Sequence, residues 1–101
     1  MPDVSPRPWT FLTNHGQVLL CIAQDPDVRL RDIGDLVGIT ERAAHRIVED
    51  LVAAEYVERE RVGRRNRYTV RTDLSLPDPM AREQRVADLL HLLASPGRSP
   101  A

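Results

Sequence analysis

The chain contains a single cysteine and no lysine, and no hydrophobic run is long enough to cross a bilayer. Because a disulfide needs two cysteines, none can form within the chain, and we expect Cys21 to be a small buried thiol on a helix. The N-terminal residues are rich in proline and lack the apolar core of an export signal. We therefore expect a cytoplasmic protein.

Catalytic and metal-binding patterns are also missing from the sequence. It shows no nucleophile paired with a base, no paired carboxylates and no glycine-rich phosphate loop. His15, His45 and His91 lie far apart and share no spacing typical of metal ligands. We expect no enzyme activity, no metal site and no cofactor.

Positive charge is present, and it is concentrated in one segment. The net charge is −1 over 101 residues, of which 42% are hydrophobic, enough for one domain with a modest core. Residues 59–71 nevertheless contain six arginines and one glutamate, whereas residues 40–58 contain two arginines and five acidic residues. This distribution favours a nucleic-acid partner for residues 59–71, and the alternative is a solvated hairpin.

Apolar residues at helical spacing predict helices over residues 13–24, 30–37 and 40–54. Thr13 or Asn14 can cap the first helix and Thr40 the third, while Gly38 suits the left-handed turn after the second. We expect the second helix to bury Leu30, Ile33, Leu36 and Val37, and the third to bury Ala44, Ile47, Val48 and Leu51.

Two strands are predicted over residues 57–61 and 67–71, joined by a hairpin tip at residues 62–66. A further helix is expected over residues 79–94, after a segment with two prolines. Residues 1–9 and the tail 95–101 are expected to be flexible.

The second and third helices have the spacing of a helix-turn-helix, which places its second helix in the DNA major groove. A small residue, Gly34, falls where the two helices would cross, and Gly38 falls in the turn. The apolar positions of the motif are Ile33, Val37, Ile39, Ala44 and Ile47. An arginine-rich hairpin follows, as a wing would.

With these features the chain resembles the winged helix-turn-helix regulators of bacteria, especially small MarR-like and ArsR-like repressors. The segment ITERAAHRIVEDLVAAEYVERERVGRRNRYTV is similar to their recognition helix and wing, and the resemblance covers residues 10–72. It implies an α+β fold with three core helices, a wing of two or three strands and an additional C-terminal helix. The third strand of the wing would be formed by Val28 and Arg29. The family usually has glycine where this chain has Glu55.

The resemblance implies DNA contacts from the recognition helix and from the wing. Arginine can pair with guanine in the major groove and with phosphate. The alternative for the helix is a solvated face on which Arg42 or Arg46 pairs with Glu49 or Asp50. The helix candidates are Thr40, Glu41, Arg42, Ala43, His45 and Arg46. The wing candidates are Arg61, Arg64, Arg65, Asn66 and Arg67.

The C-terminal helix carries an apolar stripe for which two roles stay open. It can pair with the same helix of a second copy, with help from Trp9, Phe11 and Leu12, or it can cover the chain's own core. Two-fold symmetry would suit a palindromic operator. The stripe consists of Val86, Leu89, Leu90 and Leu93.

The function predicted from these patterns is sequence-specific binding of double-stranded DNA by a dimeric repressor associated with the nucleoid. Two alternatives remain: a DNA-architectural protein of low specificity, and a winged-helix protein-docking module that does not bind DNA. The sequence indicates no membrane association and leaves open whether a small-molecule effector exists.

Overall fold

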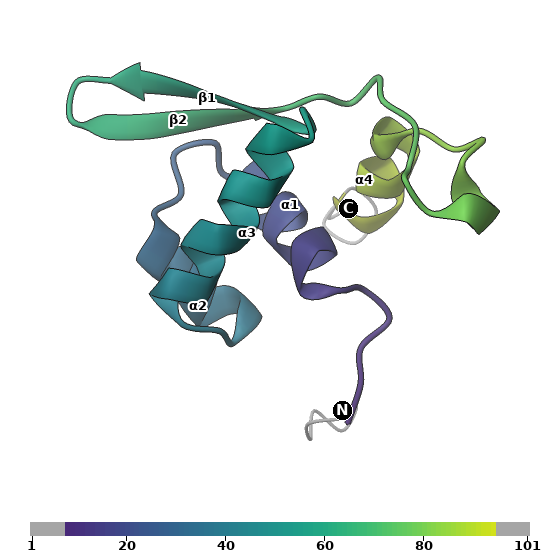
Figure 1. Ribbon diagram of the computed structural model, residues 1–101, viewed down its shortest axis with the longest axis horizontal. Coiled ribbons are helices and arrows are strands. Elements are labelled where there is room, and N and C mark those ends of the chain that lie inside the picture. Colours follow the sequence, from purple (N-terminus) through teal and green to yellow (C-terminus); the bar gives the residue numbers. More distant parts are fainter. Residues whose placement is uncertain (1–7, 95–101) are drawn as a thin grey trace, which may run out of the picture.

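The computed structural model describes residues 8–94, which form a helical core with a projecting β-hairpin (Figure 1). The segments expected to be flexible, residues 1–9 and 95–101, lie outside the described residues except for Pro8 and Trp9. The elements in order are α1 (Asn14–Gln24), α2 (Leu30–Val37), α3 (Glu41–Ala53), β1 (Val57–Val62), β2 (Arg65–Val70), a short 3₁₀ helix (Pro79–Ala81) and α4 (Val86–Ala94).

The helix ends follow the predicted capping residues. The Thr13 hydroxyl accepts a hydrogen bond from the Gly16 N–H at 3.1 Å, and the Thr40 hydroxyl accepts one from the Ala43 N–H at 3.0 Å. Each bond satisfies an N–H that would otherwise lack a partner at a helix N-terminus. Gly38 ends α2 with a φ of 87°, which costs glycine little. The helix-turn-helix therefore begins and ends where the sequence indicated.

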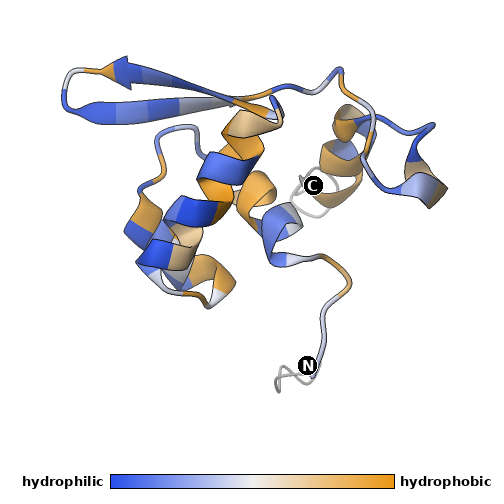
Figure 2. Cartoon of the chain, in the orientation of Figure 1, coloured by the Kyte–Doolittle hydropathy of each residue, from blue (hydrophilic) through white to orange (hydrophobic). Residues whose placement is uncertain are grey.

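The core lies where α1, α2 and α3 meet the base of the hairpin and the start of α4. All four residues predicted to point inward from α3 are buried. Figure 2 shows the hydrophobic residues concentrated on the helices, while most of the projecting hairpin is hydrophilic. Cys21 is half-buried, and burial raises the pKa of its thiol. The fully buried large side chains are Val18, Ile22, Ile33, Val48, Val57 and Val86.

The prediction that Leu36 is buried is wrong, because this side chain is 72% exposed. The two buried residues of α2 are Ile33 and Gly34, with Leu30 and Val37 half-buried on the same side. At 100° per residue, Leu36 points about 110° away from the middle of that face. A helix of two turns buries only one such face, so Leu36 is left in solvent.

The hairpin is longer and its turn tighter than predicted. β1 and β2 pair antiparallel from Val57 opposite Val70 to Val62 opposite Arg65, so only Gly63 and Arg64 form the turn. Gly63 takes a φ of 65° at the first turn position, where two-residue hairpin turns often need glycine. Residues 62, 65 and 66, which the sequence assigned to the tip, therefore belong to the strands.

The sheet of the described region has two strands, so the third strand considered at Val28 and Arg29 does not form. A single backbone hydrogen bond takes its place, from the Tyr68 N–H to the Pro26 carbonyl at 2.9 Å. The loop between α1 and α2 thus runs beside β2 without becoming a strand.

The helix predicted over residues 79–94 is broken, since a 3₁₀ turn at Pro79–Ala81 is separated from α4, which begins at Val86. Backbone pairing explains the break. The Leu76 N–H donates to the Gln84 carbonyl, and the Val86 N–H donates to the Leu74 carbonyl, each at 2.9 Å. These bonds hold residues 84–86 extended beside residues 74–76. The helix can start only after this pairing ends.

Candidate nucleic-acid interface

The exposed face of α3 carries the predicted recognition residues at its N-terminal half. Glu41, Arg42, His45 and Arg46 are exposed, and Ala43 is half-buried between them. Neither Arg42 nor Arg46 forms an ion pair within residues 8–94. Their guanidinium groups are therefore available to an external anion or base edge.

The acidic groups at the C-terminal half of α3 have partners other than these arginines. Glu49 receives two hydrogen bonds from the Arg59 guanidinium on β1 and lies 3.3 Å from the His45 imidazole. Asp50 lies 2.8 Å from the His15 imidazole on α1. The Arg59 hydrogen bond holds the pKa of Glu49 below its usual value. The pairing of Arg42 or Arg46 with Glu49 or Asp50, considered from helical spacing, does not occur.

The wing, which is the hairpin of residues 57–70, presents its arginines in different environments. Arg64 sits in the two-residue turn and makes no hydrogen bond or ion pair within the described part of the chain. The Arg61 guanidinium donates to the Gly63 carbonyl at 3.3 Å, close to the turn. Asn66 is half-buried on β2. Among the wing arginines, Arg64 is thus exposed and has no hydrogen bond or ion pair to residues 8–94.

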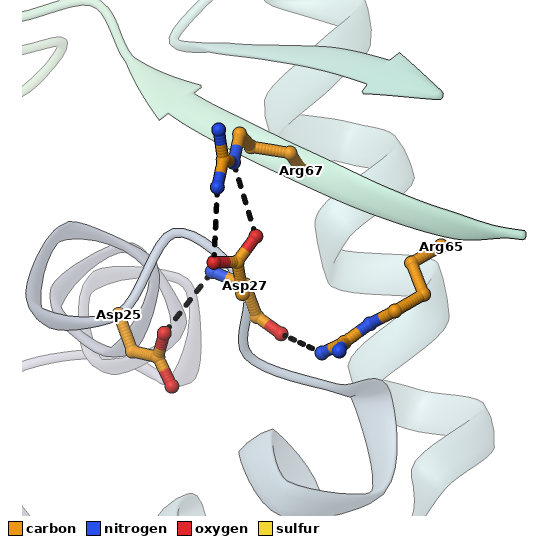
Figure 3. Close-up of polar contacts among 4 residues, drawn as sticks. All are labelled: Asp25, Asp27, Arg65 and Arg67. Carbon is orange, nitrogen blue, oxygen red and sulfur yellow. Dashed lines mark hydrogen bonds and ion pairs between the residues drawn. The ribbon is translucent and has the colours of Figure 1, made fainter. Parts of the chain in front are cut away.

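Arg65 and Arg67 both reach back to the loop between α1 and α2 (Figure 3). Arg67 donates from Nε and Nη2 to the two carboxylate oxygens of Asp27, at 3.1 and 3.3 Å. Arg65 donates from Nη2 to the Asp27 backbone carbonyl at 3.1 Å. The hydrogen bond from Arg67 is the main cause that lowers the pKa of the Asp27 carboxyl. Arg67, predicted as a DNA contact, therefore already has an intramolecular partner.

Two further arginines belong to this surface and were missed by sequence reasoning. Arg29 and Arg31 at the start of α2 line an open hollow together with Arg64 and Arg65 of the wing, and Glu41 of α3 borders it as well. The net charge of this segment gave no sign of them, because residues 25–39 contain two arginines and four acidic residues and are negative overall. Their position at the N-terminus of a predicted helix was the available signal, since such ends favour anions.

The hollow brings together the N-terminal ends of α2 and α3 and the turn of the wing. Figure 1 shows the hairpin projecting on the side of the molecule where α2 and α3 lie. The arrangement therefore places a solvent-facing helix end and a cationic hairpin on one surface. Such a surface can contact a groove and the adjoining phosphates of duplex DNA.

Arg71, directly after the wing, forms its own ion pairs and does not line the hollow. Its guanidinium donates to the Asp73 carboxylate at 3.3 and 3.4 Å and lies 3.8 Å from Glu58. The hydrogen bond from Arg71 holds the pKa of Asp73 below its usual value.

Comparison with known proteins identifies the family of this chain. The model of the MarR family matches residues 10–67, which run from just before α1 into β2. The comparison with curated proteins gives no match. No helix in residues 8–94 has the length and apolar character needed to cross a membrane. The matched span covers more than half of the chain and includes the whole helix-turn-helix, and the chain belongs to the MarR family of DNA-binding transcriptional regulators.

Proposed function

We propose that the protein is a sequence-specific regulator that binds palindromic double-stranded DNA as a homodimer and represses transcription by occupying its operator. In this proposal residues 40–54 enter the major groove, and residues 62–66 of the wing contact the minor groove or the backbone. The observation that carries it is the hollow at which the starts of α2 and α3 meet Arg64 of the wing, which has no partner within residues 8–94.

The recognition helix would read bases through its free arginines. Arg42 and Arg46 can each make the bidentate contact with guanine O6 and N7, and His45 lies between them on the same exposed face. Thr40 and Ala43 lie at the start of α3, where the helix dipole favours a phosphate and the Ala43 N–H already donates to the Thr40 hydroxyl. Glu41 can accept a hydrogen bond from a cytosine amine.

The second copy is proposed from side chains that α4 leaves in solvent. Leu92 and Leu93 are 68% and 40% exposed, whereas Leu89 and Leu90 are half-buried. Val86 is only 1% exposed and packs in the chain's own core, which is the other role left open for the stripe. Trp9 and Phe11 form an exposed edge-to-face aromatic pair before α1 that can extend the same contact. Association with the nucleoid in the cytoplasm would follow from DNA binding.

The test is equilibrium binding to genomic duplex fragments, including the region upstream of its own gene, over a range of salt concentrations. We expect tight binding to a few palindromic fragments above a weak background that depends on salt. Arg42→Ala and Arg46→Ala should each cost about 1–3 kcal/mol on the preferred fragment and reduce discrimination between fragments. Arg64→Ala should weaken binding to all fragments and reduce the salt slope by about 1.

Arg82→Ala is the matched control, because Arg82 is exposed beyond the 3₁₀ turn and lines no part of the hollow. It removes the same charge and should leave binding nearly unchanged. Uniform affinity for every fragment would instead support an architectural protein of low specificity. Absence of binding even at low salt would support a protein-docking module.

A further inference from the structure

The loop between α1 and α2 holds one strand of the wing at three points. The Asp27 carboxylate accepts two hydrogen bonds from Arg67, and the Asp27 carbonyl accepts one from Arg65 (Figure 3). The Pro26 carbonyl accepts the Tyr68 N–H at 2.9 Å. All three donors belong to β2. The orientation of the wing is thus tied to this loop.

The loop is itself fixed by local hydrogen bonds. The Asp25 carboxylate accepts the Asp27 N–H at 3.1 Å, and the Asp25 carbonyl accepts the Val28 N–H at 3.0 Å. Val28 is buried in the core, and α2 begins two residues later. A contact with Asp27 therefore connects the wing to the helix-turn-helix itself.

The wing needs such contacts because a two-stranded hairpin has little stability of its own. On the other strand, Arg59 of β1 is bound to Glu49 of α3. Beyond these points the hairpin extends to the turn at Gly63 and Arg64 without further ion pairs in the described residues. The position of Arg64 relative to α3 is therefore set by the buried base of the hairpin at Val57 and Tyr68, by the hydrogen bonds of β2 to the loop, and by the ion pairs Arg59–Glu49 and Arg67–Asp27.

We propose that Asp27 is a positioning residue for DNA binding: through Arg67 it holds β2 in the orientation that brings Arg64 to the DNA backbone. The inference rests on the proposed DNA-binding function. It predicts an effect opposite in sign to simple electrostatics. Removing a carboxylate near a cationic surface should strengthen the attraction to DNA, whereas loss of positioning should weaken binding.

The test compares Asp27→Ala with Asp35→Ala on the preferred duplex. Asp35 is an exposed carboxylate on α2 with no hydrogen bond in the described residues, so its variant makes the same charge change without affecting the wing. We expect Asp27→Ala to weaken affinity about threefold to tenfold. Asp35→Ala should leave affinity unchanged or raise it. Equal or tighter binding by Asp27→Ala would overturn the proposal, because Asp27 would then only compete with DNA for Arg65 and Arg67.

Two further measurements separate positioning from a general loss of structure. The Arg64→Ala substitution should reduce affinity less in the Asp27→Ala background than in the wild-type chain, because a displaced wing has already lost that contact. Asp27→Asn, which keeps the shape of the side chain, should weaken affinity in the same direction while thermal unfolding stays close to wild type. Full additivity of the two alanine substitutions would contradict the proposal.

Limited digestion with trypsin tests the wing without DNA. Cleavage after Arg64 should be at least about three times faster in Asp27→Ala than in Asp35→Ala. A hairpin that has lost this contact opens more often, and the open form is the one that the protease cleaves. Equal cleavage rates would count against the proposal. If the wild-type chain bound no duplex, the proposed function would fail, and the digestion would still report whether Asp27 holds the wing.

Discussion

Glu55 has a φ of 71°, the only positive value among the non-glycine residues in the described part of the chain. It follows α3 in a Schellman arrangement, in which the Tyr56 N–H donates to the Leu51 carbonyl and the Glu55 N–H donates to the Val52 carbonyl. A side chain with a Cβ is disfavoured in this conformation. The family usually has glycine at this point, and the chain keeps the turn without it.

We therefore expect Glu55→Gly to stabilise the protein. Removing the strain of the left-handed conformation should raise the free energy of unfolding by about 1 kcal/mol, measured by urea denaturation. Glu55→Ala is the control, because it removes the same carboxylate and keeps the Cβ, and it should bring little gain. Equal stabilisation by both variants would assign the effect to charge.

The Asp27–Arg67 ion pair should be visible in a carboxyl titration. Arg67 lowers the pKa of Asp27 in the folded chain, so the pair contributes stability above the ordinary pKa of 3.8, and the contribution is lost as pH falls through the lowered value. By ¹³C NMR we expect the pKa of Asp27 to lie below 3.8 in the wild-type chain and to rise in Arg67→Ala, where the hydrogen bond that lowers it most is lost. An unchanged midpoint in Arg67→Ala would show that Arg67 is not the cause. DNA binding near neutral pH should be insensitive to this titration.

Among the elements, α2 and α3 depend on one close contact. A Cβ added at Gly34 would lie 2.7 Å from the Ile39 carbonyl oxygen and 3.4 Å from the Glu41 backbone nitrogen. These are backbone atoms in the turn and at the start of α3, so they cannot move without shifting the recognition helix. The small residue predicted from the spacing of the motif is thus required by geometry.

Gly34→Ala is expected to lower the free energy of unfolding by about 1–3 kcal/mol, as overpacking does. It should also weaken DNA binding, because it displaces the turn that precedes Thr40. The matched control is Gly16→Ala in α1, where the new Cβ would find its nearest neighbour at an ordinary 3.5 Å. That variant should be neutral or stabilising by up to about 1 kcal/mol. Thermal unfolding of both variants provides the comparison, and equal Tm values would contradict the predicted clash.

The wing shows how a turn decides which residues share a face. With two residues in the turn, Arg59 lies opposite Tyr68 and Arg61 opposite Asn66, while Glu60 lies opposite Arg67. Directly opposed residues project from the same face of the sheet. Arg65 and Arg67 therefore project from one face of the hairpin, and Arg59 and Arg61 project from the opposite face. The length of the turn set this register, which alternation along a single strand could not define.

For the whole molecule, the proposed dimer leads to a prediction about α4. Replacing the exposed Leu92 and Leu93 together by glutamate should weaken dimerisation about tenfold or more, measured by sedimentation equilibrium, and leave thermal unfolding of the monomer nearly unchanged. Met80→Glu is the control, since Met80 is 99% exposed on the 3₁₀ turn. Unchanged association in the leucine variant would place the interface elsewhere on the chain.

Sequence patterns were sufficient for some features of the molecule and insufficient for others. The caps at Thr13, Thr40 and Gly38 and the buried face of α3 were predicted because they depend on neighbours within one or two helical turns. The exposure of Leu36 and the break before α4 were not predicted. Leu36 lies off the one face that a two-turn helix can bury, whereas the break before α4 depends on backbone pairing between residues 74–76 and 84–86, which a periodic pattern does not reveal.

For the candidate site too, some features could be predicted from the sequence and others could not. Composition and spacing identified the arginine-rich wing and the exposed start of α3, because charge density and helical period are local properties. They could not identify which arginines are already paired. Arg67 meets Asp27 across 40 residues of sequence, and Arg59 meets Glu49 across 10. Only the packing of the wing against the loop and α3 brings these groups together.

The sequence by itself determined the helix-turn-helix and the positive charge of the hairpin that follows, because hydrogen bonds within a helix and its caps connect near neighbours. The tertiary structure alone decided that Arg64 has no partner within residues 8–94 while Arg67 has one, and that Arg29 and Arg31 border the same hollow as the wing. Ion pairs depend on distances of a few ångströms between side chains, and folding fixes those distances between segments that sequence order leaves far apart.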